Sequence, residues 1–144
     1  MEPAYDLAGR VIGLAMKVHR TLGPGFLESI YQKALHYELL RNGFKSELQM
    51  PIQVRYEGIV VGDYLADLVV NDDLIVELKA ISSLLPAHEV QLVNYLTATG
   101  KNEGLLLNFG KESLEFKKKF RSYREGQNEP FAFRENFVNS VNSV

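Results

Sequence analysis

Apolar residues recur at intervals of three and four between Leu7 and Leu22, which is the repeat of an amphipathic helix. Asp6 directly precedes this segment and can cap it, because its carboxylate can accept hydrogen bonds from unpaired backbone N–H groups. The sequence "LGPGF" must end the helix, since Pro24 cannot continue it and a glycine stands on either side. A second helical repeat runs from about Phe26 to Asn42. The pattern therefore predicts a helical hairpin that covers one face of a sheet.

From Glu47 onwards apolar and polar residues alternate, which is the period of a strand with one buried face. Pro51 within "LQMPIQVRYEG" favours an edge strand or a bulge, because proline has no N–H to donate. Two further strand-like segments, residues 59–70 and 74–80, are separated by the turn "NDD", which favours an antiparallel hairpin. Within the first of them, the period of two places four residues on one face: Tyr64, Ala66, Leu68 and Val70.

Helical spacing returns at residues 86–100, which open with Pro86 and close at Gly100. The segment "GLLLNFG" at 104–110 is a short apolar run, typical of a strand buried on both faces. The segment "SLEFKKKF" at 113–120 suits an edge strand. The predicted fold class is therefore α/β (α+β), with a mixed β-sheet flanked by helices in the order αα-βββ-α-ββ.

One domain is predicted over residues 1–120, because 144 residues can form a single core and are too few for two. Residues 121–144 are predicted to form a polar C-terminal tail, with one short helix around Phe131–Val138. The chain has no cysteine, which excludes disulfides, thiolate zinc sites and cysteine nucleophiles and fits a cytoplasmic location. The N-terminus lacks a secretory leader and no apolar run approaches the roughly 20 residues that span a bilayer, so no membrane association is expected.

The formal net charge of −2 is unlike that of a protein that coats polyanions. A nucleic-acid partner would have to meet a local basic patch or bind through metal ions. Residues 111–124 contain six basic and two acidic residues, with three aromatic residues among them. Lys117, Lys118 and Lys119 could track a nucleic-acid backbone beside rings that stack on bases. The same lysines equally suit an edge strand that is protected against aggregation.

Asp67 is a carboxylate in the otherwise apolar strand "YLADLVV". A buried carboxylate there needs a partner, a proton or a metal ion. On the next strand, in "VELKA", the period of two places Glu77 and Lys79 on one face. If the hairpin register brings Asp67 beside Glu77, two carboxylates and an ammonium group converge, and a divalent cation such as Mg²⁺ would relieve the repulsion. The other interpretation is that Glu77 and Lys79 lie on a solvated strand face.

Two helical segments carry further polar side chains. In "GFLESIY", Glu28 and Tyr31 share a helix face, and Glu28 could either reach the carboxylates or only favour the helix dipole. In "HEVQLVNYL", His88, Gln91 and Tyr95 fall on one face. They could reach a phosphate or a base, or they could form an ordinary hydrated face.

These motifs together resemble a known family. "GFLESIY" resembles the G-x-x-E-x-x-Y signature of the GxxExxY family, which looks like a branch of the PD-(D/E)XK nuclease-like superfamily. Asp67 followed by "ELK" at 77–79 resembles the D…(D/E)-x-K core, and Gln91 with Tyr95 resembles a motif of the following helix. The resemblance covers about residues 6–120 and implies a restriction-endonuclease-like core. Ala66 stands where the superfamily name has proline.

The resemblance implies a metal-dependent phosphodiesterase that acts on nucleic acid, either DNA or RNA. It implies that Asp67, Glu77 and the carbonyl of Leu78 ligate Mg²⁺ or Mn²⁺. It also implies that Lys79 positions or activates the attacking water. The expected activity is therefore that of a nuclease.

Within the same resemblance, Glu28 would bind a second metal ion or fix a water on the first, and Gln91 would orient the site. Contacts to nucleic acid are expected from Tyr31, His88 and Tyr95. The alternative is a catalytically inactive nuclease-like module that binds nucleic acid or protein. The joint presence of four residues argues against a decayed site: Glu28, Asp67, Glu77 and Lys79. Analogy with nucleases that cut both strands allows a homodimer.

Overall fold

The computed structural model describes residues 6–122. Two helices that pack against each other open the fold: α1 (Leu7–Leu22) and α2 (Glu28–Arg41). Asp6 caps α1 as predicted, because its Oδ1 accepts a hydrogen bond from the Gly9 amide at 2.8 Å. The tail from residue 123, with the short helix predicted around Phe131–Val138, lies outside the described residues. None of the helices within 6–122 is long and apolar enough to cross a membrane.

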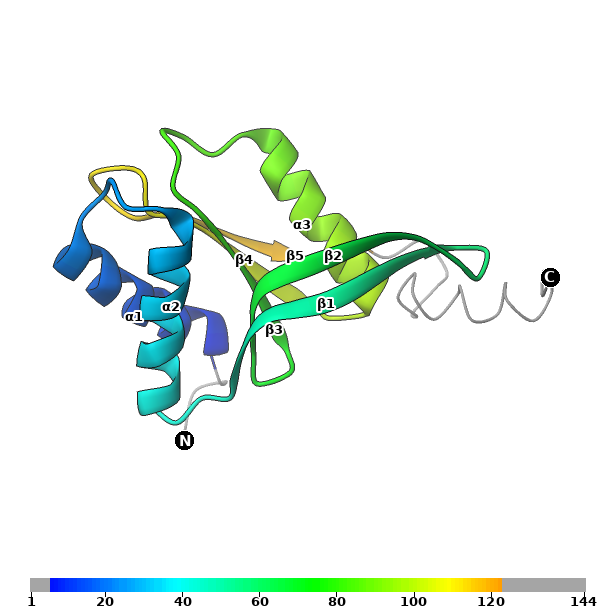
Figure 1. Cartoon of the computed structure of the whole chain (residues 1–144), viewed down its shortest axis with the longest axis horizontal. Helices are drawn as coiled ribbons and strands as arrows, with labels where there is room; N and C mark the ends of the chain where they lie inside the picture. The colour runs from blue at the N-terminus through cyan, green and yellow to red at the C-terminus, as the bar shows by residue number, and fades with distance from the viewer. Residues whose placement is uncertain (1–5, 123–144) are drawn as a thin grey trace.

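The remaining elements are β1 (Ser46–Tyr56), β2 (Ile59–Val70), β3 (Leu74–Lys79), α3 (Pro86–Thr99), β4 (Glu103–Asn108) and β5 (Glu115–Phe120). The strands form one sheet in the order β1-β2-β3-β4-β5, in which only the β3–β4 pair is parallel (Figure 1). The mixed sheet and the order αα-βββ-α-ββ are therefore confirmed. Pro51 lies on β1, an edge strand of the sheet, as predicted.

The sheet separates two apolar cores. Along β3, Leu74 and Val76 join the core beneath α1 and α2, whereas Ile75 joins the core beneath α3. The adjacent strand β4 divides in the same way, with Leu105 in the first core and Leu106 in the second. Each of these side chains is at most 1% exposed, and its burial contributes about 1.5–3 kcal/mol. The two central strands are thus buried on both faces and hold the site rigidly.

The alternation along β2 is interrupted near its middle. Tyr64 and Ala66 belong to the core beneath α3, whereas Leu68 and Val70 belong to the core beneath α1 and α2. The prediction that these four residues share one face is therefore wrong. The neighbouring strand supplies the reason, because Gln49 of β1 has a φ of 53° and lacks the cross-strand pair that its neighbours form.

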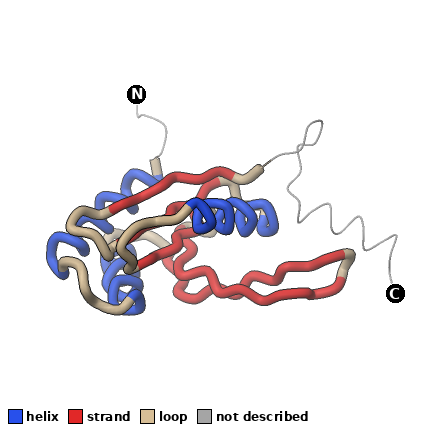
Figure 2. The backbone as a smooth tube through the Cα atoms, turned by 90° about the horizontal axis from the view of Figure 1, so that it is seen from above, coloured by secondary structure: helices blue, strands red, loops and turns tan. Residues whose placement is uncertain are grey.

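Beyond this interruption, β1 and β2 extend from the sheet as a long hairpin, away from α1 and α2 (Figures 1 and 2). The hairpin turns through two residues, Glu57 and Gly58, whose φ angles of 47° and 84° suit a type I′ turn. Its far end is exposed, whereas its base is buried in the sheet from Ala66 to Val70. The charged residues considered next lie at the buried base.

Candidate active site

Asp67 and Glu77 stand opposite each other where β2 and β3 begin to separate. The ladder between these strands runs from the pair Val70–Leu74 to the pair Leu68–Val76, and Asp67 and Glu77 come next. There, Asp67 Oδ2 accepts a hydrogen bond from the Leu78 amide at 2.8 Å, in place of a backbone carbonyl. The hairpin register therefore brings the two carboxyl groups together.

Both carboxyl groups are buried, with 9% of Asp67 and 8% of Glu77 exposed. Burial, followed by the charge of Asp67, raises the pKa of Glu77 to about 8. Burial also raises the pKa of Asp67, against the opposing effects of the Leu78 amide, Glu77 and Lys79. Near neutral pH the pair of carboxyl groups therefore retains a proton in the absence of a metal ion.

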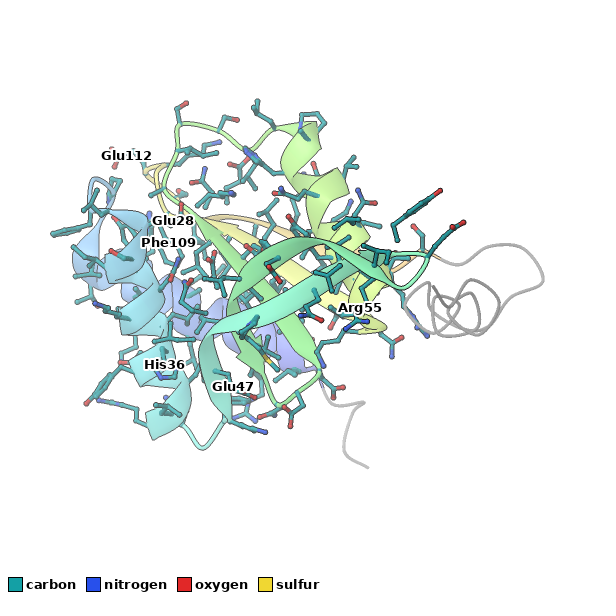
Figure 3. All side chains as sticks on the ribbon, turned by 45° about the vertical axis from the view of Figure 1, so that its right-hand side comes forward. Glu28, His36, Glu47, Arg55, Phe109 and Glu112 are labelled. Atoms are coloured by element: carbon teal, nitrogen blue, oxygen red, sulfur yellow. The ribbon has the colours of Figure 1, made fainter. Side chains whose placement is uncertain are left out.

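Lys79 and Glu28 approach this pair from two different elements. Lys79 is the last residue of β3 and is partly buried. Glu28 is the first residue of α2, as Figure 3 shows. Burial and then the charge of Asp67 raise the pKa of Glu28, whereas the charge of Lys79 lowers it. Three segments of the chain thus bring four predicted residues into one electrostatically coupled cluster.

Tyr31 explains how Glu28 is placed. Its hydroxyl donates to the Gly23 carbonyl at 2.5 Å and accepts from the Phe26 amide at 3.1 Å, so it ties the glycine-rich turn to α2. Its ring stacks on Phe109 with centroids 4.6 Å apart, and the residue is 0% exposed. This corrects the prediction of a nucleic-acid contact by Tyr31, because the side chain is used entirely within the fold.

The polar face of α3 reaches the pair through an aromatic stack. Tyr95 lies on Tyr64 of β2, with ring centroids 3.5 Å apart and planes 9° from parallel. Burial and then the charge of Glu77 raise the pKa of both phenols, and Gln91 lowers that of Tyr95. His88 instead caps α3, since its Nδ1 accepts a hydrogen bond from a backbone amide at 3.0 Å. A shallow depression is lined by Ala87, Val90, Gln91, Asn94 and Tyr95.

Comparison with known proteins shows the family of the chain. The family model of the PD-(D/E)XK nuclease superfamily matches residues 5–121. The chain belongs to this superfamily. Its fold is also similar to the crystal structure of the protein SSO0001, with a TM-score of 0.50 and 17% identity over 80% of this chain. The chain spans 58% of the length of that protein. No curated protein sequence matches it.

The lysine run of this PD-(D/E)XK domain does not form a single basic face. Successive residues of β5 point to opposite sides of the sheet. Lys119 pairs with Glu89 of α3 at 3.1 Å, whereas Lys118 lies 3.9 Å from Asp6 on the side of α1. By the same alternation, Lys117 shares the side of Lys119. Of the three lysines predicted to contact nucleic acid, only Lys117 and Lys119 therefore lie on the face that carries α3.

The superfamily implies a divalent metal ion, and the donors present fit one in part. Glu77 Oε1 is buried and has no hydrogen-bond partner among residues 6–122, so it is an available ligand atom that becomes anionic when Glu77 loses its proton. Asp67 supplies a second carboxylate, and carboxylates are the ligands that Mg²⁺ and Mn²⁺ favour. No group of three or more His, Asp or Glu side chains within the described range is arranged to hold a metal ion. An ion would therefore need water or substrate oxygens as well.

Three polar residues beside the candidate site were missed in the sequence. Gln49 Nε2 donates to Gln32 Oε1 at 2.7 Å. The Gln49 amide lowers the pKa of Asp67, and the Gln32 amide lowers the pKa of Glu28, in each case against the effect of burial. Asn108 is 0% exposed, and its amide bonds both the N–H and the carbonyl of Ile81, which fixes the chain after β3. An asparagine within an apolar strand was a usable signal for Asn108. No local pattern marked the two glutamines.

Proposed function

We propose that this PD-(D/E)XK domain hydrolyses phosphodiester bonds of nucleic acid with the aid of a divalent metal ion, Mg²⁺ or Mn²⁺. The observation that carries the proposal is Glu77 Oε1, a buried carboxyl oxygen without a hydrogen-bond partner in residues 6–122, beside Asp67. An unsatisfied buried acceptor costs on the order of 1–3 kcal/mol, and more when it is charged. A cation between the two carboxylates would remove this cost and their mutual repulsion.

Asp67, Glu77 and the Leu78 carbonyl would hold the ion, and water and phosphate oxygens of the substrate would complete its coordination. When bound, the ion polarises a phosphoryl oxygen and neutralises negative charge there. Glu28, whose carboxyl group interacts with Asp67, would accept a hydrogen bond from a water at the site or bind a second ion. Because ligation requires ionised carboxylates, ion binding would displace the proton of Glu77.

Lys79 would supply a fixed positive charge at the reacting phosphate. Among the described residues no carboxylate lies within ion-pair distance of its ammonium group, so the group is available to the substrate. In hydrolysis a bond forms between a water oxygen and phosphorus, the bond from phosphorus to a sugar oxygen breaks, and the leaving oxygen takes up a proton. Lys79 would orient the water and stabilise the charge that develops on the phosphoryl oxygens.

The G-x-x-E-x-x-Y spacing has a physical role in this proposal. Gly23 and Gly25 have φ angles of 72° and 110°, which let the chain turn sharply before α2. Tyr31 then fastens this turn and thereby sets the position of Glu28, one helical turn earlier. On this basis we place the chain in the GxxExxY branch of the superfamily.

Nucleic acid would approach along α3. The depression at Gln91 and Tyr95 borders a second one that shares Val90 and Asn94 with it and ends at Lys119. Tyr95 offers a ring on which a base can stack, and Lys119, which would exchange its ion pair with Glu89 for a phosphate, offers a charge for the backbone. This path leads from the carboxylates to the α3 side of β5.

Calorimetric titration with Mn²⁺ tests the proposal without requiring knowledge of the substrate. We expect saturable binding to the wild type and at least about tenfold weaker binding to Asp67→Asn, because one ligand charge is removed. Asp63→Asn is a matched control, since Asp63 is an exposed carboxylate on the same strand. No saturable binding to the wild type, even with bis(4-nitrophenyl) phosphate present, would favour the catalytically inactive binding module instead.

A further inference from the structure

Gln49 has a backbone conformation that is unusual for a strand. Its φ of 53° lies in the left-handed region, which side chains other than glycine and asparagine enter only at a cost. Among residues 6–122, the other non-glycine residues with positive φ all lie in turns: Glu57, Asn71 and Asp72. Gln49 alone is within a strand in the described range, so its conformation is not explained by a change of chain direction.

The location of Gln49 connects it to the carboxylate cluster. Its neighbours on β1 pair with Leu68 and Ala66, which places Gln49 opposite Asp67 on β2. Its side-chain amide donates to Gln32 Oε1 at 2.7 Å, across 17 residues of sequence. Gln32 is only 8% exposed and lies one helical turn after Glu28 on α2. Figure 3 labels Glu28, at the start of α2.

The two amides have the chemistry that such a connection needs. A carboxylate only accepts hydrogen bonds, whereas each glutamine amide offers two N–H donors and one acceptor. Gln49 can therefore donate to Gln32 and to Asp67, while Gln32 accepts from Gln49 and donates to Glu28. The side chains of Gln49 and Gln32 do interact with Asp67 and Glu28, respectively, and stabilise their ionised forms. The chain of contacts thus runs from α2 through β1 to β2.

We propose that Gln32 and Gln49 are positioning residues that hold the carboxyl groups of Glu28 and Asp67 close together against their electrostatic repulsion. The inference rests on the proposed function for its purpose, because two adjacent carboxylates serve metal binding. The left-handed backbone at Gln49 turns its amide away from the regular strand direction and toward Gln32. The same irregularity interrupts the alternation of β2, which leaves Asp67 at the site while Leu68 enters the core.

Gln49→Asn provides a test that separates positioning from simple structural support. Asparagine tolerates positive φ and retains the amide, but its side chain is one methylene shorter and cannot span to Gln32. Glu57→Asn is the matched control, because Glu57 also has positive φ, at the turn that closes the far end of the same hairpin (Figure 1). Three backgrounds are compared: the wild type, Gln49→Asn and Glu57→Asn. In each of them, the unfolding midpoints of Glu28→Gln, Asp67→Asn and the double variant are measured without metal at pH 9.

In the wild-type background the two neutralising substitutions relieve the same repulsion, so their effects on the midpoint should be clearly non-additive. We expect the non-additivity to fall by about half or more in Gln49→Asn, where the carboxylates can separate, and to persist in Glu57→Asn. A structural role would lower the midpoint and leave the non-additivity unchanged. Equal non-additivity in all three backgrounds would overturn the proposal.

Mn²⁺ affinity supplies the second readout. We expect binding to Gln49→Asn to be about tenfold weaker than binding to Glu57→Asn, as for other residues that orient metal ligands. Absence of Mn²⁺ binding to the wild type would count against the proposed function alone. The metal-free midpoints would still decide whether Gln32 and Gln49 hold the carboxylates together.

Discussion

The carboxyl groups of Asp67 and Glu77 and the ammonium groups of the β5 lysines belong to the same sheet but to different environments. Asp67 and Glu77 are buried, adjacent and of the same charge type, and one oxygen of Glu77 has no partner within residues 6–122. Lys118 and Lys119 are more exposed, and each lies near a carboxylate of another element. Burying two carboxyl groups side by side destabilises the metal-free protein. Each surface ion pair of the lysines instead contributes about 0–1 kcal/mol to stability.

This difference shows that burial, and not the number of charges, distinguishes the candidate site from an ordinary surface. The lysine run is the more conspicuous feature in the sequence, with three like charges in succession. In the structure it is divided between two faces of the sheet. The two carboxyl groups are less conspicuous in the sequence, but burial raises the pKa of both, and the charge of Asp67 raises that of Glu77 further.

The largest expected effect tests the buried region. Lys79→Ala should lower the turnover number for phosphodiester cleavage by about 10²–10³-fold, because the charge facing the phosphoryl oxygens is lost. Mn²⁺ affinity should change by less than about threefold, since Lys79 is not a ligand. Turnover on bis(4-nitrophenyl) phosphate and on a panel of nucleic acids measures the first quantity, and calorimetry measures the second. Lys33→Ala, at an exposed position of α2, is the control; an equal loss there would remove Lys79 from the mechanism.

A moderate effect concerns the stability of the metal-free protein. Because the pKa of Glu77 is about 8 in the folded protein and 4.5 ordinarily, folding takes up a proton between these values. The associated stability is fully present below pH 4.5 and is lost as the pH rises to about 8, at up to about 1.4 kcal/mol per pH unit. Glu77→Gln should remove most of this decline and be more stable than the wild type at pH 8. Urea unfolding from pH 4 to pH 9 measures the free energy of unfolding of both proteins. The same dependence of this free energy on pH in the wild type and in Glu77→Gln would contradict the burial of Glu77 as its cause.

The smallest effect is expected at the lysines, and it can overturn the comparison. Lys117→Glu should weaken nucleic-acid binding a few-fold and reduce the salt slope by about 0.7–0.9 for each phosphate that the variant no longer neutralises. Lys118→Glu is its matched control, because Lys118 is also exposed but points to the side of α1. Fluorescence anisotropy between about 50 and 200 mM salt measures the affinity and its salt slope for both variants. Equal changes in the two variants would show that the division of β5 into two faces is irrelevant to binding.

Much of the fold followed from local patterns. The helix over Leu7–Leu22, its cap at Asp6 and the strand over Ile59–Val70 were predicted from residues within a few positions of one another. The meeting of Asp67 and Glu77 was expected only if the hairpin register allowed it, and the register of the antiparallel β2–β3 pair does allow it. The prediction that Tyr31 contacts nucleic acid was wrong. Helical spacing shows that Tyr31 shares a helix face with Glu28, but it does not show which other segment covers that face.

The sequence by itself determined the elements and their order, since these depend on periodicity and on short turns, and it left the meeting of Asp67 with Glu77 dependent on the hairpin register. Only the tertiary structure decided which side chains complete the site. Glu28 interacts electrostatically with Asp67 because α2 packs against the sheet, and Tyr31 is buried because Phe109 of a distant segment stacks on it. Gln49 meets Gln32 because an irregular strand turns toward that helix. Such contacts join residues far apart in the chain, and packing rather than local propensity selects them.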